Sequence, residues 1–382
     1  MWWKKRVYLD VAAGAGGNPS SPHEEGRRAK AMLEEARTDI ARLIEVRSDD
    51  VIFTSGATES NALAILGIAK AGDHVLYLPS AHASIVENMK LLGKRGVEVE
   101  ALPISIEGES AFGGKKIRVD TGALAKMIRP ETRLISMDAV CGETGVIWNT
   151  REVANLLQTH VGRTTSHMGG RALLHVDASQ APLTEKISRA HFGADLLTFD
   201  GAKVGVRGIG ALIAHRTIPL NPLYQGGGQE RGLRSGSESP ELAARFATAL
   251  RAALHEREAF CASALNERRQ LVETIMRDIP NVSIQEGRVQ APHILNLSFP
   301  GRDTDYLVAL LDEAGFAVGA RSACETDSED GSRAVFALTG DQERARATLR
   351  ISWNSRVSPR DLRRFSRALA RAVAFVDSNS RG

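Results

Sequence analysis

Short apolar runs alternate with segments of helical periodicity through most of the chain. Seven of these runs have the length and composition of buried strands, and they cover residues 51–53, 75–77, 97–99, 134–137, 172–176, 195–199 and 210–213. Segments with a helical pattern, such as residues 62–69 and 84–92, lie between them and can cross from one strand to the next. This alternation predicts an α/β fold with a mainly parallel seven-stranded sheet.

The pattern changes after a glycine-rich stretch that ends near Ser237. A long helical region rich in alanine, arginine and glutamate follows over residues 241–277, and strand-like runs recur near residues 294–299 and 349–353. The length of the chain is also typical of two domains. The predicted domains are a large one over residues 18–250 and a smaller α+β one over residues 1–17 and 251–382.

The last helix is predicted from its first residues and from its apolar stripe. Ser358 is placed as the N-cap, Pro359 lies in the first turn and Asp361 occupies the third position. Apolar residues recur on one face at 362, 365, 369, 373 and 376, and arginines surround them at 360, 363, 364, 367 and 371. The arginine face is typical of a solvated helix, and contact with a partner is the alternative.

Composition narrows the class of protein. The chain has 382 residues, of which 43% are hydrophobic and 25% are charged, with a formal net charge of +3. This charge is too small to predict binding to nucleic acid or to an anionic membrane. No apolar run has the length of a membrane span, and the first residues lack the apolar stretch of a signal peptide. Cys141, Cys261 and Cys324 have no paired spacing, which argues against disulfides and metal sites and predicts a cytoplasmic protein.

Two polar side chains follow predicted strands at positions where an α/β sheet places its ligands. Asp177 follows the apolar run 172–176, and Lys203 lies just past the run 195–199. Because the carboxyl ends of parallel strands meet at one edge of a sheet, both side chains are expected to face one pocket. A buried acid and a lysine there suit a pyridine aldehyde cofactor. The lysine forms a Schiff base with the aldehyde, and the acid keeps the ring nitrogen protonated.

Gly56, Ala57 and Thr58 follow another predicted strand and open a helix. Free N–H groups at a helix N-terminus, joined by a threonine hydroxyl, bind phosphate well. The same residues also form a common helix cap, which is the more frequent role on local grounds alone. The presence of Asp177 and Lys203 favours phosphate binding.

At these residues the chain resembles the class V aminotransferase family, and within it the cysteine desulfurases of the iron–sulfur-assembly and nitrogen-fixation type. Further matching stretches cover residues 8–10, 18–21, 53–61, 208–212, 226–237, 296–299, 322–324 and 349–352. The resemblance implies fold type I of the transferases that depend on pyridoxal 5′-phosphate, with that cofactor bound.

The resemblance assigns four residues to the cofactor ring. Lys203 is implied to bind the aldehyde and to act as a catalytic base, and Asp177 to contact the ring nitrogen. His82 is implied to stack on the ring and to transfer protons, and Gln180 to hydrogen-bond the phenolic oxygen. A histidine at a strand-to-helix turn is otherwise usually solvated, although its pKa near neutrality suits proton transfer.

The phosphate is assigned to residues from two subunits. The resemblance implies that Ala57 and Thr58 bind it from one subunit. Ser237, which stands where the family has a threonine, is implied to reach the phosphate of the neighbouring subunit. Taken without the resemblance, the glycine-rich stretch 224–237 is typical of a flexible loop. The implied assembly is a homodimer with shared sites.

Arg350, Asn18 and Cys324 are implied to act on the substrate. Arg350 fits the fork that binds an amino-acid carboxylate, although a mid-strand arginine is more often an edge charge. Asn18 is implied to bind substrate as well. Cys324 is implied to take the sulfur. A single cysteine is more often a buried, inert thiol, but the polar residues 325–332 that follow this one indicate an exposed loop.

The predicted function is that of a cysteine desulfurase. It would convert L-cysteine to L-alanine and pass the sulfur, as a persulfide on Cys324, to an acceptor protein. The acceptor would be an iron–sulfur scaffold or a carrier for tRNA thiolation. One alternative is another pyridoxal-phosphate enzyme of the class, an aminotransferase or a selenocysteine lyase. The other is a weakened paralogue that acts as a binding partner in sulfur transfer.

Several positions depart from the family pattern, and those at 141, 200 and 202 motivate the weakened paralogue as an alternative. Asp200 and Ala202 replace a serine and a histidine, and Cys141 replaces an asparagine that contacts cofactor and substrate. A carboxylate at position 200 would repel a phosphate if it pointed inward. Four acids also follow Cys324 closely, and nearby negative charge raises the pKa of a thiol.

Overall fold

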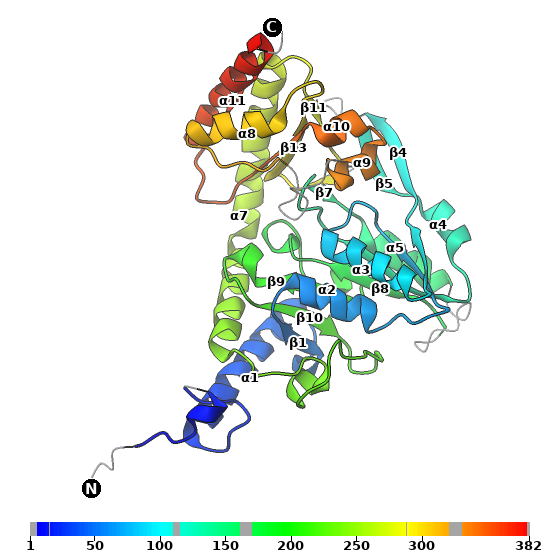
Figure 1. The fold of residues 1–382 in the computed structure, drawn as a ribbon, viewed down its shortest axis with the longest axis vertical. Coiled ribbons are helices and arrows are strands. Elements are labelled where there is room, and N and C mark those ends of the chain that lie inside the picture. Colours follow the sequence, from blue (N-terminus) through cyan, green and yellow to red (C-terminus); the bar gives the residue numbers. More distant parts are fainter. Residues whose placement is uncertain are drawn as a thin grey trace.

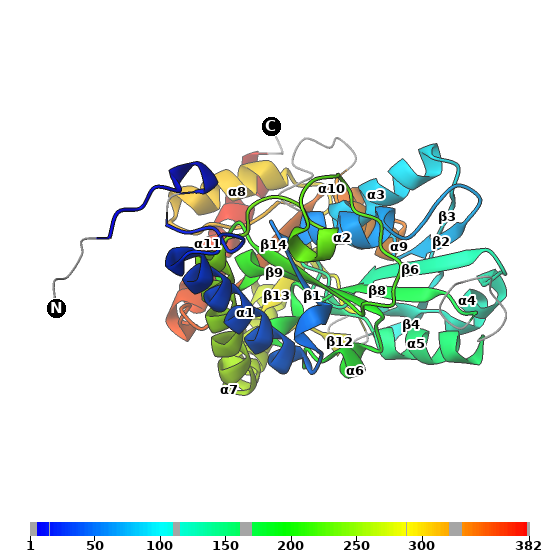
Figure 2. The same cartoon turned by 90° about the horizontal axis from the view of Figure 1, so that it is seen from below.

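The computed structural model describes residues 6–14, 16–109, 115–160, 170–287, 289–320 and 331–379. Its centre is a seven-stranded sheet (Figures 1 and 2). In spatial order the strands are β1 (Val51–Thr54), β10 (Gly210–Ala214), β9 (Leu196–Asp200), β8 (Leu173–Asp177), β6 (Thr132–Asp138), β2 (His74–Tyr77) and β3 (Glu98–Ala101). All seven predicted strands fall in this sheet, so the predicted fold class is confirmed.

The sheet is mainly parallel, as predicted. Strands β9, β8, β6, β2 and β3 run in one direction, and β10 runs antiparallel to both of its neighbours. Strands β8 and β10 are buried along their whole length, which explains why their sequences are near-continuous apolar runs. The carboxyl ends of β2, β6, β8 and β9 meet at one edge, where the chain enters polar loops.

Helices cover both faces of the sheet (Figure 2). Helices α2 (Ala57–Leu66) and α3 (Ala83–Lys94) lie on one face, and α5 (Thr150–Thr159) and α6 (Arg189–Phe192) lie on the other. Helix α4 (Thr121–Met127) packs against α5, and α1 (Glu24–Ile44) packs against the first half of α7 (Pro240–Asp278).

Helix α7 links two hydrophobic cores. It has 39 residues and confirms the long helix predicted over residues 241–277. Apolar residues up to Leu254 pack in or against the core around the large sheet, and those from Phe260 onward belong to the second core. The domain boundaries given above stay a prediction. The segment 6–14 lies against the start of α1, where Arg6 pairs with Glu25.

The second core surrounds a small antiparallel sheet of β11 (Ser283–Ile284), β13 (Ile294–Ser298) and β14 (Thr348–Ser352). The last two confirm the strands predicted near 294–299 and 349–353. The remaining helices are α8 (Thr304–Glu313), α9 (Arg333–Thr339), α10 (Gln342–Arg346) and α11 (Pro359–Asn379). Helix α9 packs Ala334 and Leu338 into the core around the large sheet, and so connects the two parts of the molecule.

Two strand pairs have no counterpart in the sequence prediction. Strand β4 (Ile104–Glu109) pairs with β5 (Lys115–Val119) as an excursion from the large sheet. Strand β7 (Val146–Ile147) pairs with β12 (Val289–Gln290), which joins chain segments far apart in sequence. Strands β7 and β12 have two residues each, which is too short for a periodic pattern to be recognised in the sequence.

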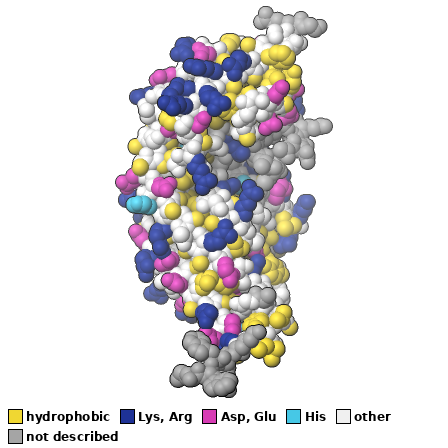
Figure 3. Space-filling model, turned by 90° about the vertical axis from the view of Figure 1, so that its left-hand side faces the viewer, with side chains coloured by type: hydrophobic (Ala, Val, Ile, Leu, Met, Phe, Trp, Pro, Cys, Tyr) yellow, Lys and Arg dark blue, Asp and Glu magenta, His cyan; other side chains and the backbone are white. Residues whose placement is uncertain are grey.

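Helix α11 begins as predicted. Ser358 Oγ accepts a hydrogen bond from the Asp361 amide (3.2 Å), and Asp361 Oδ2 accepts one from the Ser358 amide (3.1 Å). Five arginines of this helix, at 360, 363, 364, 367 and 371, are exposed. Lysine and arginine side chains gather at the upper end of the face in Figure 3, where α11 lies. Among the described residues, no helix is both long enough and apolar enough for a membrane span.

Candidate active site

A pocket of about 150 Å³ lies at the carboxyl edge of the parallel strands. Four residues of the predicted site line it: His82, Gln180, Lys203 and Arg350. The first three follow β2, β8 and β9, so the strand order itself brings them together. Arg350 comes from β14 of the small sheet. The pocket therefore lies between the two parts of the fold.

Asp177 ends β8 at this edge and is only 6% exposed. Its Oδ2 accepts a hydrogen bond from Asn61 Nδ2 (2.7 Å), and its Oδ1 accepts one from the Ser179 amide (2.9 Å). Asn61 Nδ2 also donates to Ser84 Oγ (2.8 Å), which lies 2.8 Å from His82 Nδ1. A continuous chain of side chains thus connects the two predicted ring contacts.

Asn61 and Ser84 were not among the predicted site residues. Asn61 lies one helical turn after Ala57 on α2 and is fully buried. One signal could have identified Asn61. It is an amide side chain on the inner face of a helix that begins at a predicted phosphate site, and a buried amide needs hydrogen-bond partners. Ser84 holds His82 through its amide as well, which donates to His82 Nδ1 (3.2 Å). The neutral ring therefore carries its proton on Nε2.

Lys203 and Gln180 are placed by two tight turns. Lys203 lies in the short helix η4 (Gly201–Val204), which Asp200 caps by accepting a hydrogen bond from the Ala202 amide (3.0 Å). Gln180 lies directly against Gly142, where an added Cβ would come within 2.7 Å of Gln180 Nε2. Glycine at this position is what allows the close approach.

The residues predicted to bind the cofactor phosphate fit their role less well than those predicted to contact the cofactor ring. Ala57 is buried and Thr58 is exposed at the start of α2. A Cβ added at Gly56, the N-cap, would lie 3.7 Å from Asp200 Oδ1. The carboxylate of Asp200 therefore lies beside the helix end where the phosphate was predicted, and like charges repel there. Neither Thr58 nor Ser237 lines the pocket, and Ser237 is exposed.

Arg350 marks the side of the pocket where a substrate carboxylate was predicted. Its Nη1 donates to the Gly142 carbonyl (3.4 Å), and its backbone pairs with Gly319. Cys324 lies outside the described residues. The chain on either side of it reaches the pocket, because Gly319 pairs with Arg350 and Arg333 lines the wall.

Arg333 is a pocket residue that sequence reasoning missed. It begins α9, and its Nη1 and Nη2 donate to the carbonyl oxygens of Pro79 (2.7 Å) and Ala81 (2.8 Å). The Arg333 guanidinium thus holds the turn that carries His82 against the start of α9. These contacts span about 250 residues of sequence, and no local pattern indicates them.

A second buried carboxyl group lies beside Asp177. Asp138 is its register partner on β6, so both side chains point to the same face of the sheet. Asp138 is 4% exposed, lines the pocket and has one oxygen without a hydrogen-bond partner. Burial and then the charge of Asp177 raise the pKa of Asp138 to about 8, so this acid is protonated at neutral pH.

Cys141 is not a candidate nucleophile. Burial first, and the neighbouring Asp138 next, raise the pKa of its thiol to about 12. Such a thiol stays protonated and inert near neutrality. Asn18, predicted to contact substrate, does not line the pocket either. Its side chain donates to the Ala13 carbonyl (3.0 Å) and accepts from the Ser20 amide (2.9 Å), which holds an N-terminal turn.

Fold and site together define a class V aminotransferase: the model of that family matches residues 7–365, and the chain belongs to it. Two curated relatives are cysteine desulfurases. IscS 1 of Archaeoglobus fulgidus is 31% identical over 369 residues, covering 95% of this chain and 91% of its own. IscS of Rickettsia bellii is 33% identical over 344 residues, covering 88% and 79%.

Solved structures agree with this assignment. A NifS-like protein superposes with a TM-score of 0.81 at 26% identity, covering 96% of this chain and 94% of its own. DndA from Streptomyces lividans superposes with a TM-score of 0.70 at 30% identity, covering 90% and 94%. The resemblance predicted from the sequence motifs is confirmed.

Proposed function

We propose that this protein is a cysteine desulfurase that converts L-cysteine to L-alanine. One observation carries the proposal. A single pocket gathers Lys203, His82, Gln180 and Arg350, and side-chain hydrogen bonds join His82 to the buried Asp177. Relatives named cysteine desulfurase, which align with nearly the whole chain, support it.

The ring end of the pocket fits pyridoxal 5′-phosphate. Asp177 is buried and fixed by two donors, as suits a carboxylate that holds a proton on the pyridine nitrogen. Lys203 would hold the aldehyde carbon, and Gln180 the phenolic oxygen. When bound, the cofactor supplies an electron-accepting ring that stabilises negative charge at the substrate Cα.

The protein's own residues act on the substrate around that ring. Arg350 binds the α-carboxylate with its guanidinium. The Lys203 amine, once free, takes the proton from Cα, and His82 Nε2 moves protons at the exposed mouth of the pocket. The Asp177–Asn61–Ser84 chain keeps the imidazole in one orientation while it does so.

Cys324 performs the sulfur transfer. Its thiolate attacks the sulfur of the substrate, so that an S–S bond forms while the Cβ–S bond breaks. The electron pair of the broken bond stays on Cβ, which takes a proton and becomes the methyl group of alanine. The sulfur and its hydrogen remain on Cys324 as a persulfide. No external oxidant is needed.

We further propose a homodimer in which Ser237 of one subunit joins Ala57 and Thr58 of the other at the phosphate. The exposure of Ser237 and its place outside its own pocket support this. The persulfide would pass to an acceptor protein, an iron–sulfur scaffold or a carrier for tRNA thiolation. Cys324 must remain a thiol between turnovers, which fits the cytoplasmic location expected from the sequence.

The test is alanine formation from L-cysteine with added pyridoxal phosphate and a thiol reductant. Wild type should form alanine, and Cys324→Ala should form little. Cys261→Ala is the matched control, because this half-buried thiol lies on α7 and donates to the Leu183 carbonyl (3.3 Å). It should keep wild-type activity. Absence of alanine from the wild type would refute the proposal.

The position of Asp200 favours the weakened paralogue as the second candidate. A protein that cannot be loaded with pyridoxal phosphate would support that candidate. A protein that loads, and whose Lys203 is trapped by borohydride, but that forms alanine equally well without Cys324, would instead be another enzyme of the class.

A further inference from the structure

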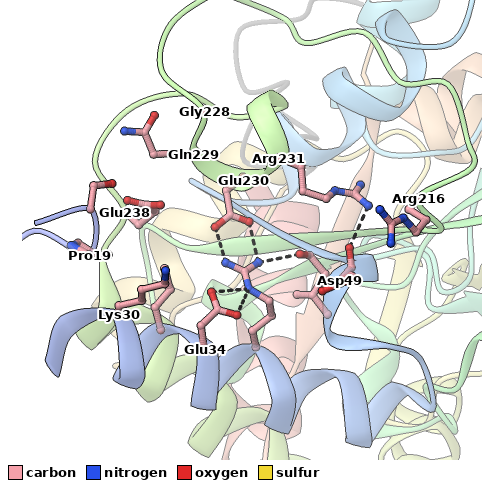
Figure 4. Close-up of a pocket in the computed structure, with 14 residues that line it drawn as sticks. Pro19, Lys30, Glu34, Asp49, Arg216, Gly228, Gln229, Glu230, Arg231 and Glu238 are labelled. Atoms are coloured by element: carbon pink, nitrogen blue, oxygen red, sulfur yellow. Dashed lines mark hydrogen bonds and ion pairs between the residues drawn. The ribbon is translucent and has the colours of Figure 1, made fainter. Parts of the chain in front are cut away.

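The glycine-rich stretch 224–237 is anchored at its centre by a buried carboxylate. Glu230 lies in the short helix η5 (Gln229–Gly232), in the wall of a cavity of about 500 Å³ (Figure 4). Its side chain is 1% exposed. Both of its oxygens accept hydrogen bonds from the terminal nitrogens of Arg37 on α1, at 2.7 and 2.8 Å. Such a two-pronged pair fixes orientation as well as distance.

The pair also covers the open edge of the large sheet. Strand β1 is an edge strand of the large sheet, so the N–H and C=O groups on its outer side have no neighbouring strand to bond with. Glu230 Oε2 accepts a hydrogen bond from the Phe53 amide (2.8 Å), and Arg37 Nη1 donates to the Val51 carbonyl (2.7 Å). The loop is therefore joined to the sheet as well as to α1.

The backbone at this point is strained. Glu230 and Arg231 are consecutive non-glycine residues with φ of 47° and 61°. Left-handed backbone persists at such residues only when the surrounding contacts hold it. Arg231 contributes one more contact, from its Nη1 to the Asp49 carbonyl (2.9 Å; Figure 4). The contacts of the buried pair and of Arg231 hold this turn in place.

A second anchor ties the loop to the predicted phosphate end of α2. Glu59, the residue after Thr58, accepts hydrogen bonds from the Tyr224 hydroxyl (2.7 Å) and from Arg234 Nε (3.2 Å). Ser237 follows Arg234 by three residues. It is exposed, and its side chain forms no hydrogen bond within the described part of the chain. The hydroxyl is thus presented outward from a loop that is held on both sides.

We propose that Arg37 and Glu230 are positioning residues that hold the 224–237 loop so that Ser237 meets the cofactor phosphate of the partner subunit. This rests on the proposed function above. The pair touches neither cofactor nor substrate. It acts through the loop, and its loss therefore affects the site of the other subunit rather than its own.

Glu230→Gln tests the pair by keeping the shape of the side chain and removing its charge. Affinity for pyridoxal phosphate, followed by the absorbance of the lysine-bound cofactor, should fall about tenfold or more, the worth of one hydrogen bond to a charged group. Ser237→Ala should lose as much, and the double variant no more than either single one. Glu34→Gln, the matched control, removes the exposed carboxylate that contacts the same arginine and should leave affinity unchanged.

Mixed dimers distinguish positioning from general damage to the fold. In a dimer of one Glu230→Gln subunit and one Lys203→Ala subunit, the only site with a lysine receives an intact loop from its partner. Its affinity should return to the wild-type value. Should Glu230→Gln fail to fold, Arg37→Lys replaces it in the same design, because it keeps the charge and loses the two-pronged geometry.

The outcomes separate this inference from the proposed function. Wild-type affinity in the Glu230→Gln homodimer, or weak binding that persists in the mixed dimer, would overturn the positioning role alone. A wild-type protein that binds no pyridoxal phosphate would overturn the proposed function itself.

Discussion

Replacing Asp138 by asparagine should stabilise the cofactor-free protein, by an amount that grows as the pH rises. The ordinary pKa of this carboxyl is 3.8, and burial beside Asp177 raises it to about 8. Between these values the unfolded chain releases the proton while the native state keeps it. Stability therefore falls as the pH rises through this window. Asparagine has the shape of the protonated acid and cannot ionise.

The size of the effect follows from the same two values. One pKa unit corresponds to about 1.4 kcal/mol, so the penalty carried by Asp138 reaches about 4 kcal/mol at pH 7. It levels off above pH 8, where both states are ionised, and disappears only well below the ordinary pKa of 3.8, where both are protonated. Such a change is large against a typical total stability of about 5–15 kcal/mol.

Urea unfolding of the cofactor-free wild type and Asp138→Asn at pH 5, 6, 7 and 8 measures this difference. Asp361→Asn is a control of opposite sign, because hydrogen bonds from Ser358 lower the pKa of Asp361. Its ionised form stabilises the start of α11, so Asp361→Asn should be less stable than wild type by an amount that stays constant from pH 5 to 8, because this contribution is lost only below the ordinary pKa of 3.8. A gain for Asp138→Asn that stays constant from pH 5 to 8 would refute the buried proton.

Three further changes test other parts of the site. Asp200→Ser should tighten pyridoxal phosphate binding about tenfold by removing a charge beside the helix N-terminus, measured by absorbance titration; unchanged affinity would mean that this carboxylate does not sense the phosphate. Arg333→Lys cannot bond the carbonyls of both Pro79 and Ala81. It should lower the free energy of urea unfolding by about 1–2 kcal/mol and lower kcat for alanine formation. A wild-type kcat would show that this contact does not affect turnover. Asn61→Ala should cost about 1–3 kcal/mol and shift the pH dependence of the bound-cofactor absorbance; an unchanged absorbance profile would contradict the coupling of Asp177 to His82.

Much of the fold could be predicted because its signals are local. Buried strands are continuous apolar runs, and each was recognised without knowing its neighbours. The gathering of Lys203, Gln180 and His82 follows from strand direction alone, since parallel strands end at one edge. The caps of α11 were equally local.

The rest depended on pairing between distant segments. Asp138 directly follows the strand predicted over residues 134–137, and only its register with Asp177 makes it a buried acid beside another. The 224–237 stretch has the composition of a flexible loop, yet Glu230 fixes it through an arginine 193 residues away. Polar residues that find buried partners across the chain give no periodic signal, and so they escape prediction.

The continuity of α7 has a consequence for how the protein unfolds. Between Leu250 and Phe260 the helix has no fully buried side chain, and its contacts there are few: Leu254 packs partly buried against the first core, and Arg257 Nη1 donates to the Glu185 carbonyl (3.1 Å). Helix formation is cooperative, and a break in the middle requires two new ends. Each half of α7 is therefore stabilised by the core that holds the other half. Glycine substitutions between residues 250 and 260 would weaken this coupling and let the two cores unfold in separate transitions.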